Sequence, residues 1–230
     1  MERNTANCPH CGAELKPLEV EFNGHSFSIG FEPCHCEGAE AERMAAMRAE
    51  AEREVLAASE RTGRIMRKAG IPKRFWMVEK GGDWRSGAYI VGPVGVGKTH
   101  MAARMAKQAL SENASVKFLT GGEFLRSIRD TFGGEGSEGD ILSKLRSCDL
   151  LVLDDLGKDK PTDWAVSMLF QLIDARYNEE LPTVVTSQYE RDELLRRLSA
   201  GEADTARAIV SRLFEMCPRI RLDGKDRRLG

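Results

Sequence analysis

The sequence predicts an α/β fold in which helices flank a five-stranded, mainly parallel sheet. From residue 88 onward, short apolar runs alternate with longer amphipathic segments, the pattern of parallel strands that are covered on both faces. A glycine-rich turn follows the first apolar run, and two adjacent carboxylates end a later one. Both features are typical of parallel sheets that bind phosphate groups at the carboxyl ends of their strands.

The N-terminal residues 1–36 predict a small zinc-binding module. Two close pairs, Cys8 with Cys11 and Cys34 with Cys36, flank a stretch that could form a hairpin, which fits a four-thiolate tetrahedral site. The alternative is four unconnected thiols. Structural zinc contributes roughly 10–16 kcal/mol of apparent binding free energy, enough to fold so short a segment.

Residues 37–70 predict a long linking helix. The segment is rich in Ala, Glu, Arg and Met, which are strong helix formers. Apolar side chains such as Met44, Met47, Val55 and Ile65 recur on one face. The helix could be solvated, could dock on the adjoining domain or could bind a partner.

The remaining residues, 71–230, predict the α/β domain. Gly70 and Pro72 end the preceding helix. The expected strands are 88–91, 116–119, 150–153, 183–187 and 219–222, and the expected helices are 99–110, 122–131, 141–146, 164–177, 191–198 and about 205–216. Only 223–230 follow the last strand, so we expect no C-terminal lid domain.

The motif GPVGVGKT, from Gly92 to Thr99, matches the phosphate-loop pattern G-x-x-x-x-G-K-[ST]. Its backbone N–H groups and the following helix would bind the phosphates of ATP. Lys98 would reach the β- and γ-phosphates, and the Thr99 hydroxyl would ligate Mg²⁺. An accidental glycine-rich turn is improbable between a strand and a helix. The expected nucleotide-binding residues are Gly92, Pro93, Val94, Gly95, Val96, Gly97, Lys98, Thr99 and His100.

The run LLVLDDLG, from Leu150 to Gly157, predicts the second half of the nucleotide site. A buried strand that ends in two carboxylates delivers them to the sheet edge beside the phosphate loop. We expect Asp154 to hold Mg²⁺ and Asp155 to orient or deprotonate the attacking water.

With these motifs the chain resembles the helicase-loader family of AAA+ ATPases, the DnaC and DnaI type and their relative IstB, the ATPase partner of a transposase. AGIPKRF (Ala69–Phe75) resembles the segment ahead of the core that helps to enclose the base. GEFLRSIRD (Gly122–Asp130), VVTSQY (Val184–Tyr189) and SRLFE (Ser211–Glu215) resemble the helix after the second strand, the sensor-1 strand and the arginine-finger box.

The resemblance implies further site residues. Sensor 1 would be Gln188 or Ser187, where the family usually has Asn, and Arg212 would be an arginine finger that acts on a neighbouring subunit. Arg126 and Arg129 would contact single-stranded DNA. Structural roles remain open for these three arginines: a surface salt bridge for Arg212 and a solvated helix for the other two. Turnover would be slow and dependent on assembly.

Composition limits the other possibilities. The 230 residues are 41% hydrophobic and 30% charged, with a formal net charge of −2, so any DNA contact needs a local basic patch. Basic residues near the end, Lys225 and Arg227 to Arg228, are expected to be solubilising charge. The sequence carries no signal core and no membrane-spanning run, so we expect a cytoplasmic protein with no membrane partner.

Together, the resemblance implies an ATP-dependent loader of a replicative DNA helicase that uses Mg²⁺ and zinc, binds single-stranded DNA and forms a homo-oligomer on ATP or DNA. One alternative is an IstB-like ATPase that activates a transposase. Another is a nucleotide-switched binding module with little hydrolysis.

Overall fold

The computed structural model describes residues 6–22, 25–129, 138–158, 161–199 and 203–227. It divides into two compact units, Met1–Thr62 and Gly63–Gly230, which are described separately. Helix α1 (Glu37–Ala69) contributes residues to both. Among the described residues, no helix is long and apolar enough to cross a membrane.

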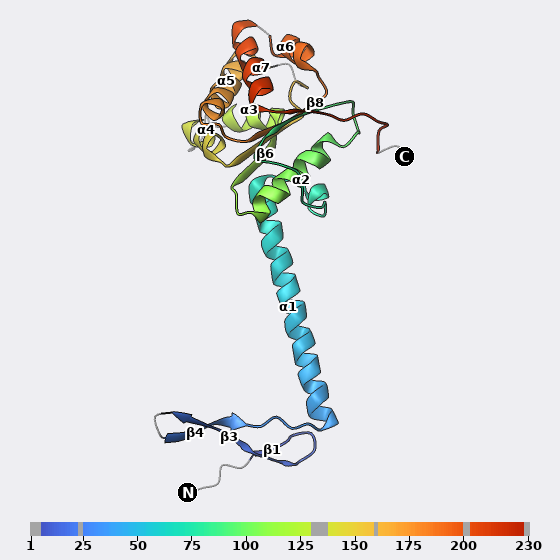
Figure 1. Cartoon of the computed structure of the whole chain (residues 1–230), viewed down its shortest axis with the longest axis vertical. Helices are drawn as coiled ribbons and strands as arrows, with labels where there is room; N and C mark the ends of the chain where they lie inside the picture. The colour runs from blue at the N-terminus through green and yellow to red at the C-terminus, as the bar shows by residue number, and fades with distance from the viewer. Residues whose placement is uncertain (1–5, 23–24, 130–137, 159–160, 200–202, 228–230) are drawn as a thin grey trace. The chain divides into compact units, whose positions relative to one another are not determined.

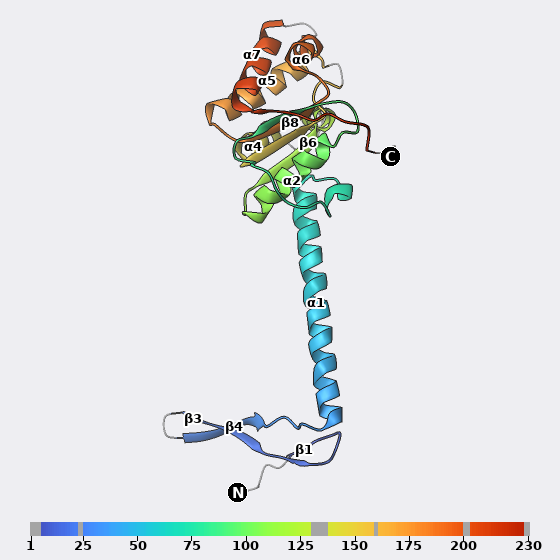
Figure 2. The same ribbon diagram turned by 45° about the vertical axis from the view of Figure 1, so that its right-hand side comes forward.

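The first unit contains two pairs of antiparallel strands and most of α1. Strand β1 (Ala6–Asn7) pairs with β2 (Glu14–Leu15), and β3 (Pro17–Phe22) pairs with β4 (His25–Phe31). The hairpin expected between the two cysteine pairs is therefore present as β3 and β4 (Figure 2).

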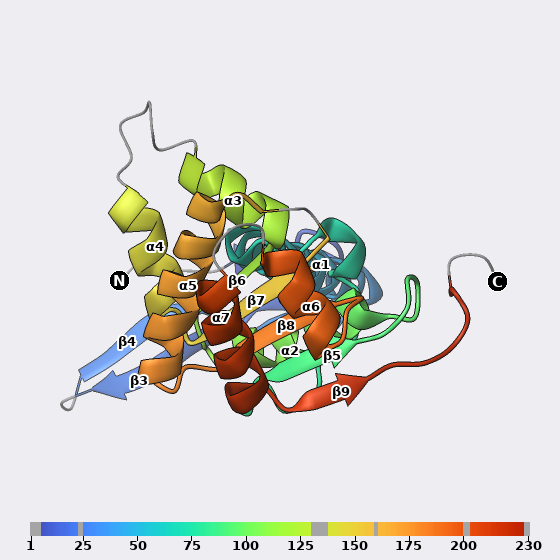
Figure 3. The same ribbon diagram turned by 90° about the horizontal axis from the view of Figure 1, so that it is seen from above.

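The second unit is built on a five-stranded sheet with the order β6-β7-β8-β5-β9, and every neighbouring pair is parallel. Figure 3 shows the five strands side by side. The predicted fold class and the five strand positions are confirmed. The strands are β5 (Ala88–Val91), β6 (Val116–Thr120), β7 (Leu150–Asp154), β8 (Thr183–Ser187) and β9 (Arg219–Arg221).

Helices cover both faces of this sheet because successive strand side chains point to opposite sides. The helices are α2 (Lys98–Ser111), α3 (Gly121–Arg129), α4 (Glu138–Ser147), α5 (Asp163–Asn178), α6 (Arg191–Leu198) and α7 (Ala203–Met216), with a 3-10 turn η1 (Lys73–Phe75) before the sheet. Tyr89 and Val91 pack into one apolar cluster with α3 to α7, whereas Ala88 and Ile90 pack into another with α2 and the end of α1. Figure 1 shows α2 on one side of the sheet and α5 and α7 on the other.

The strand order positions the site. Strands β7, β8 and β5 are consecutive neighbours in the sheet, so the loops at their carboxyl ends lie beside one another. The glycine-rich loop follows β5, Asp154 ends β7 with Asp155 directly after it, and Ser187 ends β8. The predicted site residues from three distant stretches therefore meet at one sheet edge.

Candidate nucleotide-binding site

The motif Gly92–Thr99 comprises the loop between β5 and α2 and the first two residues of α2. Gly97 lies just before α2 with a φ of 105°, a conformation that side chains with a β-carbon rarely adopt. Lys98 is buried, and its Nζ donates to the carbonyl oxygens of Gly92 at 2.8 Å and Pro93 at 2.7 Å. The loop thus curls around its own lysine at the N-terminus of α2, where the helix dipole favours anions.

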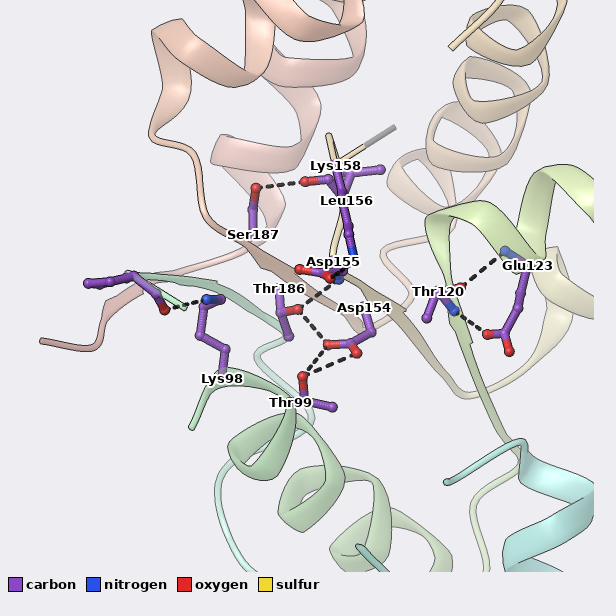
Figure 4. A network of polar contacts seen from close by, with 11 residues as sticks. Lys98, Thr99, Thr120, Glu123, Asp154, Asp155, Leu156, Lys158, Thr186 and Ser187 are labelled. Atoms are coloured by element: carbon purple, nitrogen blue, oxygen red, sulfur yellow. Dashed lines mark hydrogen bonds and ion pairs between the residues drawn. The ribbon is translucent and has the colours of Figure 1, made fainter. Parts of the chain in front are cut away.

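Thr99 and Asp154 are in direct contact (Figure 4). The Thr99 Oγ1 donates to Asp154 at 2.9 Å from Oδ1 and 3.1 Å from Oδ2, and the Thr186 Oγ1 donates to Oδ1 at 2.6 Å. Burial raises the pKa of the Asp154 carboxyl, and the hydrogen bonds from Thr186 and Thr99 oppose that shift. A hydroxyl and a carboxylate side by side are oxygen donors that suit Mg²⁺.

Asp155 has left-handed backbone geometry, with a φ of 61°. Its N–H donates to the Thr186 Oγ1 at 2.9 Å, and its carboxylate pairs with Lys158 at 3.5 Å. Thr186 therefore contacts both aspartates, donating to one and accepting from the other. Thr186 was not among the predicted site residues, since a threonine inside an apolar strand carries no signal of its own.

Lys98, Thr99, Asp154 and Asp155 line a cavity of about 760 Å³. This volume is within the roughly 300–1,000 Å³ usual for cofactor sites. The loop and α2 contribute Val94, Gly95, Gly97, Lys98, Thr99 and His100; the ends of β6, β7 and β8 contribute Thr120, Asp154, Asp155 and Gln188; the rest are Arg74, Phe75, Lys158 and Arg227. Of the predicted loop residues, Val96 is instead buried, and Gly92 and Pro93 contribute carbonyls to Lys98.

An aromatic group closes one part of this cavity. The Phe75 ring lies 6.5 Å from the His100 ring in an edge-on arrangement, and the Arg74 guanidinium lies 4.6 Å from the Phe75 centroid. A flat apolar ring beside a phosphate loop can pack against a nucleobase. Phe75 belongs to the segment that the sequence resemblance places at the base.

The structure separates the two sensor-1 candidates. Ser187 is fully buried, donates to the Leu156 carbonyl at 2.7 Å and accepts from the Tyr189 N–H at 3.2 Å. Gln188 lines the cavity. Gln188 is thus the residue placed to reach a bound nucleotide, whereas Ser187 holds the turn after β7.

Arg212 lies on α7, outside the cavity lining. Its guanidinium pairs with Asp174 on α5 at 2.8 Å, and the side chain is 27% exposed. It also lies 5.2 Å from the Phe170 ring and 5.5 Å from the Tyr177 ring. Within this chain the residue makes the salt bridge that was the alternative, so a role on a neighbouring subunit stays a prediction.

The two arginines expected to touch DNA lie on α3. Arg126 is exposed. Arg129 ends the helix, and its side chain lies outside the described residues. Phe124, on the same helix, is buried in the apolar cluster. DNA contact by this helix stays a prediction.

The four N-terminal cysteines come together in the first unit. Their sulfurs all lie within 4.8 Å of one another, with Cys8 3.7 Å from Cys36 and Cys11 3.5 Å from Cys34. These separations match the roughly 3.8 Å between sulfurs that a tetrahedral site with Zn–S bonds of about 2.3 Å requires. The Gly12 N–H donates to the Cys8 carbonyl at 2.8 Å and closes the tight turn. The donor set fits zinc.

The pKa values of two thiols in this cluster, Cys8 and Cys11, are shifted in opposite directions. Backbone N–H groups of Cys11 and His10 lower the pKa of Cys8 to about 6. For Cys11, the Ala13 N–H lowers the pKa, but the three neighbouring cysteine sulfurs raise it, and the result is about 12. Closely spaced thiolates repel one another, and a bound divalent cation would relieve that repulsion.

The fold and the site define a P-loop nucleotide-binding protein of the AAA+ class: a parallel five-stranded sheet, a glycine-rich loop, and an aspartate that contacts the loop threonine. A family model described as IstB-like ATP binding protein matches residues 85–230. The chain therefore belongs to the IstB-like ATP-binding protein family.

Relatives by sequence fall into two groups. The replicative helicase loader DnaI of Bacillus subtilis is 29% identical over 148 residues, covering 62% of this chain and 47% of that protein. The loader DnaC of Escherichia coli is 29% identical over 117 residues, covering 50% and 48%. A putative insertion sequence ATP-binding protein of Sinorhizobium fredii is 31% identical over 150 residues, covering 64% and 59%. The chain thus spans about half the length of the loaders it matches.

Solved structures show the same fold. The crystal structure of the DnaC helicase loader matches with a TM-score of 0.56 at 22% identity, covering 66% of this chain and all of that one. The crystal structure of DnaI matches with a TM-score of 0.54 at 25% identity, covering 72% and 83%. The AAA+ fold expected from the resemblance is confirmed.

Proposed function

We propose that this protein is an ATP-dependent loader of a replicative DNA helicase, and that it works in the cytoplasm on single-stranded DNA during replication initiation. The observation that carries the ATP-dependent part is the contact between Thr99 and Asp154 inside the cavity that Lys98 also lines. The partner is supported by relatives named as replicative helicase loaders.

The side chains divide the chemistry of ATP hydrolysis between them. Loop N–H groups and Lys98 bind the phosphates, and Thr99 with Asp154 would hold Mg²⁺, which neutralises phosphate charge when bound. Asp155, at the end of β7, orients the attacking water, and Gln188 polarises it. The Thr186 hydroxyl donates to the Asp154 carboxylate and accepts from the Asp155 backbone N–H, and so keeps both residues in place.

Hydrolysis and DNA binding would take place in a homo-oligomer. Arg212 would leave Asp174, its partner in this chain, to reach the γ-phosphate of a neighbouring subunit, so hydrolysis would require a homo-oligomer. Arg126 and Arg129 on α3 would bind the negatively charged phosphates of the DNA backbone. Zinc on the four cysteines would fold the N-terminal module, which we propose binds the helicase.

A second candidate is an IstB-like ATPase that activates a transposase. It is favoured by the family match and by the 31% identity to an insertion sequence ATP-binding protein. We favour the loader because the N-terminal cysteine cluster of this chain, Cys8, Cys11, Cys34 and Cys36, is similar to that of DnaI-like loaders. Both candidates use the same nucleotide site, so the partner distinguishes them.

The test is capture of purified partners. The full chain, with ATP and Mg²⁺, is incubated with its host's replicative helicase or with a neighbouring transposase. We expect helicase capture that Cys8→Ser and Cys34→Ser abolish, while Cys148→Ser, which changes a buried thiol outside the cluster, keeps it. Transposase capture without helicase capture would replace the loader with the IstB-like activator.

A further inference from the structure

The segment after β9 runs alongside the phosphate loop. The Leu222 N–H donates to the Val91 carbonyl at 2.8 Å, and the Arg227 N–H donates to the Gly95 carbonyl at 3.1 Å. The backbone of residues 222–227 is therefore attached at one end to strand β5 and at the other to the loop itself.

Gly95 makes this close approach possible. Its φ is +80°, and a β-carbon there would overlap the Asp226 carboxyl group. The phosphate-loop pattern leaves this position open, since it fixes only the first and last glycines, the lysine and the hydroxyl residue. A glycine at 95 is therefore favoured both by this backbone conformation and by the approach of Asp226.

Arg227 extends from this segment into the nucleotide cavity. Its side chain lines the cavity together with Gly97 and Lys98, and its Nη1 would lie 3.6 Å from a β-carbon built on Gly97. Among the described residues, no carboxylate forms an ion pair with Arg227, whereas Arg219 and Arg221 nearby are both paired with Glu190. A guanidinium beside a phosphate loop and without a carboxylate partner suits a phosphate ligand.

We infer that Arg227 binds the polyphosphate of the nucleotide held by its own subunit, and that residues 222–227 form part of the nucleotide site. This inference rests on the ATP-binding half of the proposed function. The guanidinium adds a further cation to a cavity that Lys98, Arg74 and Lys158 also line. It can make two parallel hydrogen bonds to phosphate oxygens, which an ammonium cannot. Arg227 is therefore a binding residue, not a solubilising charge.

The experiment measures the dissociation constants of AMP, ADP and ATP with Mg²⁺ by calorimetry for the full chain and four variants, one of which, Lys98→Ala, tests the phosphate loop itself. Arg227→Ala should weaken ATP binding roughly tenfold or more, because a charged hydrogen-bond partner is removed. It should weaken ADP binding by less and AMP binding by under about twofold. Arg227→Lys should recover part of the loss. Lys225→Ala removes an exposed charge of the same segment that does not line the cavity, and should keep wild-type affinity.

Three results would overturn the inference. Equal ATP affinity of Arg227→Ala and wild type would show that the guanidinium does not touch phosphate. Equal losses for all three nucleotides would show that Arg227 does not act on the polyphosphate, and a lower thermal midpoint without nucleotide would then assign it to holding the segment. If wild type and Lys98→Ala both fail to bind ATP, the proposed function fails together with the inference. If wild type binds ATP and only Lys98→Ala does not, the ATP-binding part of the proposed function holds whatever the result for Arg227.

Discussion

Thr186→Val should remove the hydroxyl that forms hydrogen bonds to both aspartates of the site. The change keeps the shape of a side chain that is 1% exposed, but it removes a 2.6 Å bond to Asp154 and the 2.9 Å acceptor of the Asp155 N–H. A hydrogen bond to a charged group contributes about 1.5–3 kcal/mol, and an unpaired buried donor costs about 1–3 kcal/mol. We therefore expect a loss of several kcal/mol in the free energy of unfolding at neutral pH.

The pH dependence of this destabilisation follows from the pKa of Asp154. Burial raises the pKa of Asp154, and the Thr186 hydroxyl lowers it, so the variant should raise that pKa further. An acid whose pKa is raised by folding binds protons more tightly in the folded state, and stability falls as pH rises through the folded pKa. The destabilisation by Thr186→Val should thus be smaller at about pH 5 than at pH 7, as measured by urea unfolding.

The same shift should appear in function. Asp154 must be ionised to hold Mg²⁺, so the midpoint of Mg²⁺-dependent ATP binding should move to higher pH in Thr186→Val. The comparison is Ser187→Ala, which removes a neighbouring buried hydroxyl that bonds a carbonyl and not a carboxylate. That variant should lose stability but keep the wild-type midpoint. An unchanged midpoint in Thr186→Val, with equal destabilisation at both pH values, would refute this account of Thr186.

Three further predictions concern the cysteine cluster, Arg212 and the two arginines of α3. Elemental analysis should find about one zinc per chain, and Cys8→Ser should lose it without a change in ATP affinity; a folded, metal-free N-terminal module would contradict this. Mixing Arg212→Ala with Lys98→Ala subunits should restore some ATPase activity, because mixed interfaces keep one intact site, and no recovery at any ratio would leave Arg212 with its salt bridge alone. Replacing Arg126 and Arg129 with Ala should reduce the salt dependence of single-stranded DNA binding by about 0.7 in log–log slope for each arginine that binds a phosphate, whereas an unchanged slope would exclude them.

Much of the fold was predictable from the sequence, because period and composition decide it locally. Strands β5 and β8 have the predicted bounds, and the others differ by one residue at their ends. Apolar runs such as Leu150–Leu153 are buried on both faces, which is why they read as continuous hydrophobic segments. The phosphate loop and its aspartates were predictable because their chemistry fixes residue types at fixed spacing.

The rest of the site depends on which side chain faces the cavity, and that is decided by tertiary packing. Ser187 and Gln188 are adjacent in the chain, yet one is buried against Leu156 and the other lines the cavity. Arg227 looked like one more terminal charge, since nothing in its neighbours shows that the backbone there returns to Gly95. Thr186 acts through hydrogen bonds to two residues far away in the sequence.

The left-handed backbone of Asp155 affects how its role can be probed. Aspartate and asparagine tolerate this conformation better than most residues, because their short polar side chains bond locally to the backbone. Asp155→Asn therefore removes the charge and preserves the turn. Alanine or glutamate at the same position would add conformational strain. A loss of activity in such a variant would then have two causes, the missing base and the displaced strand end.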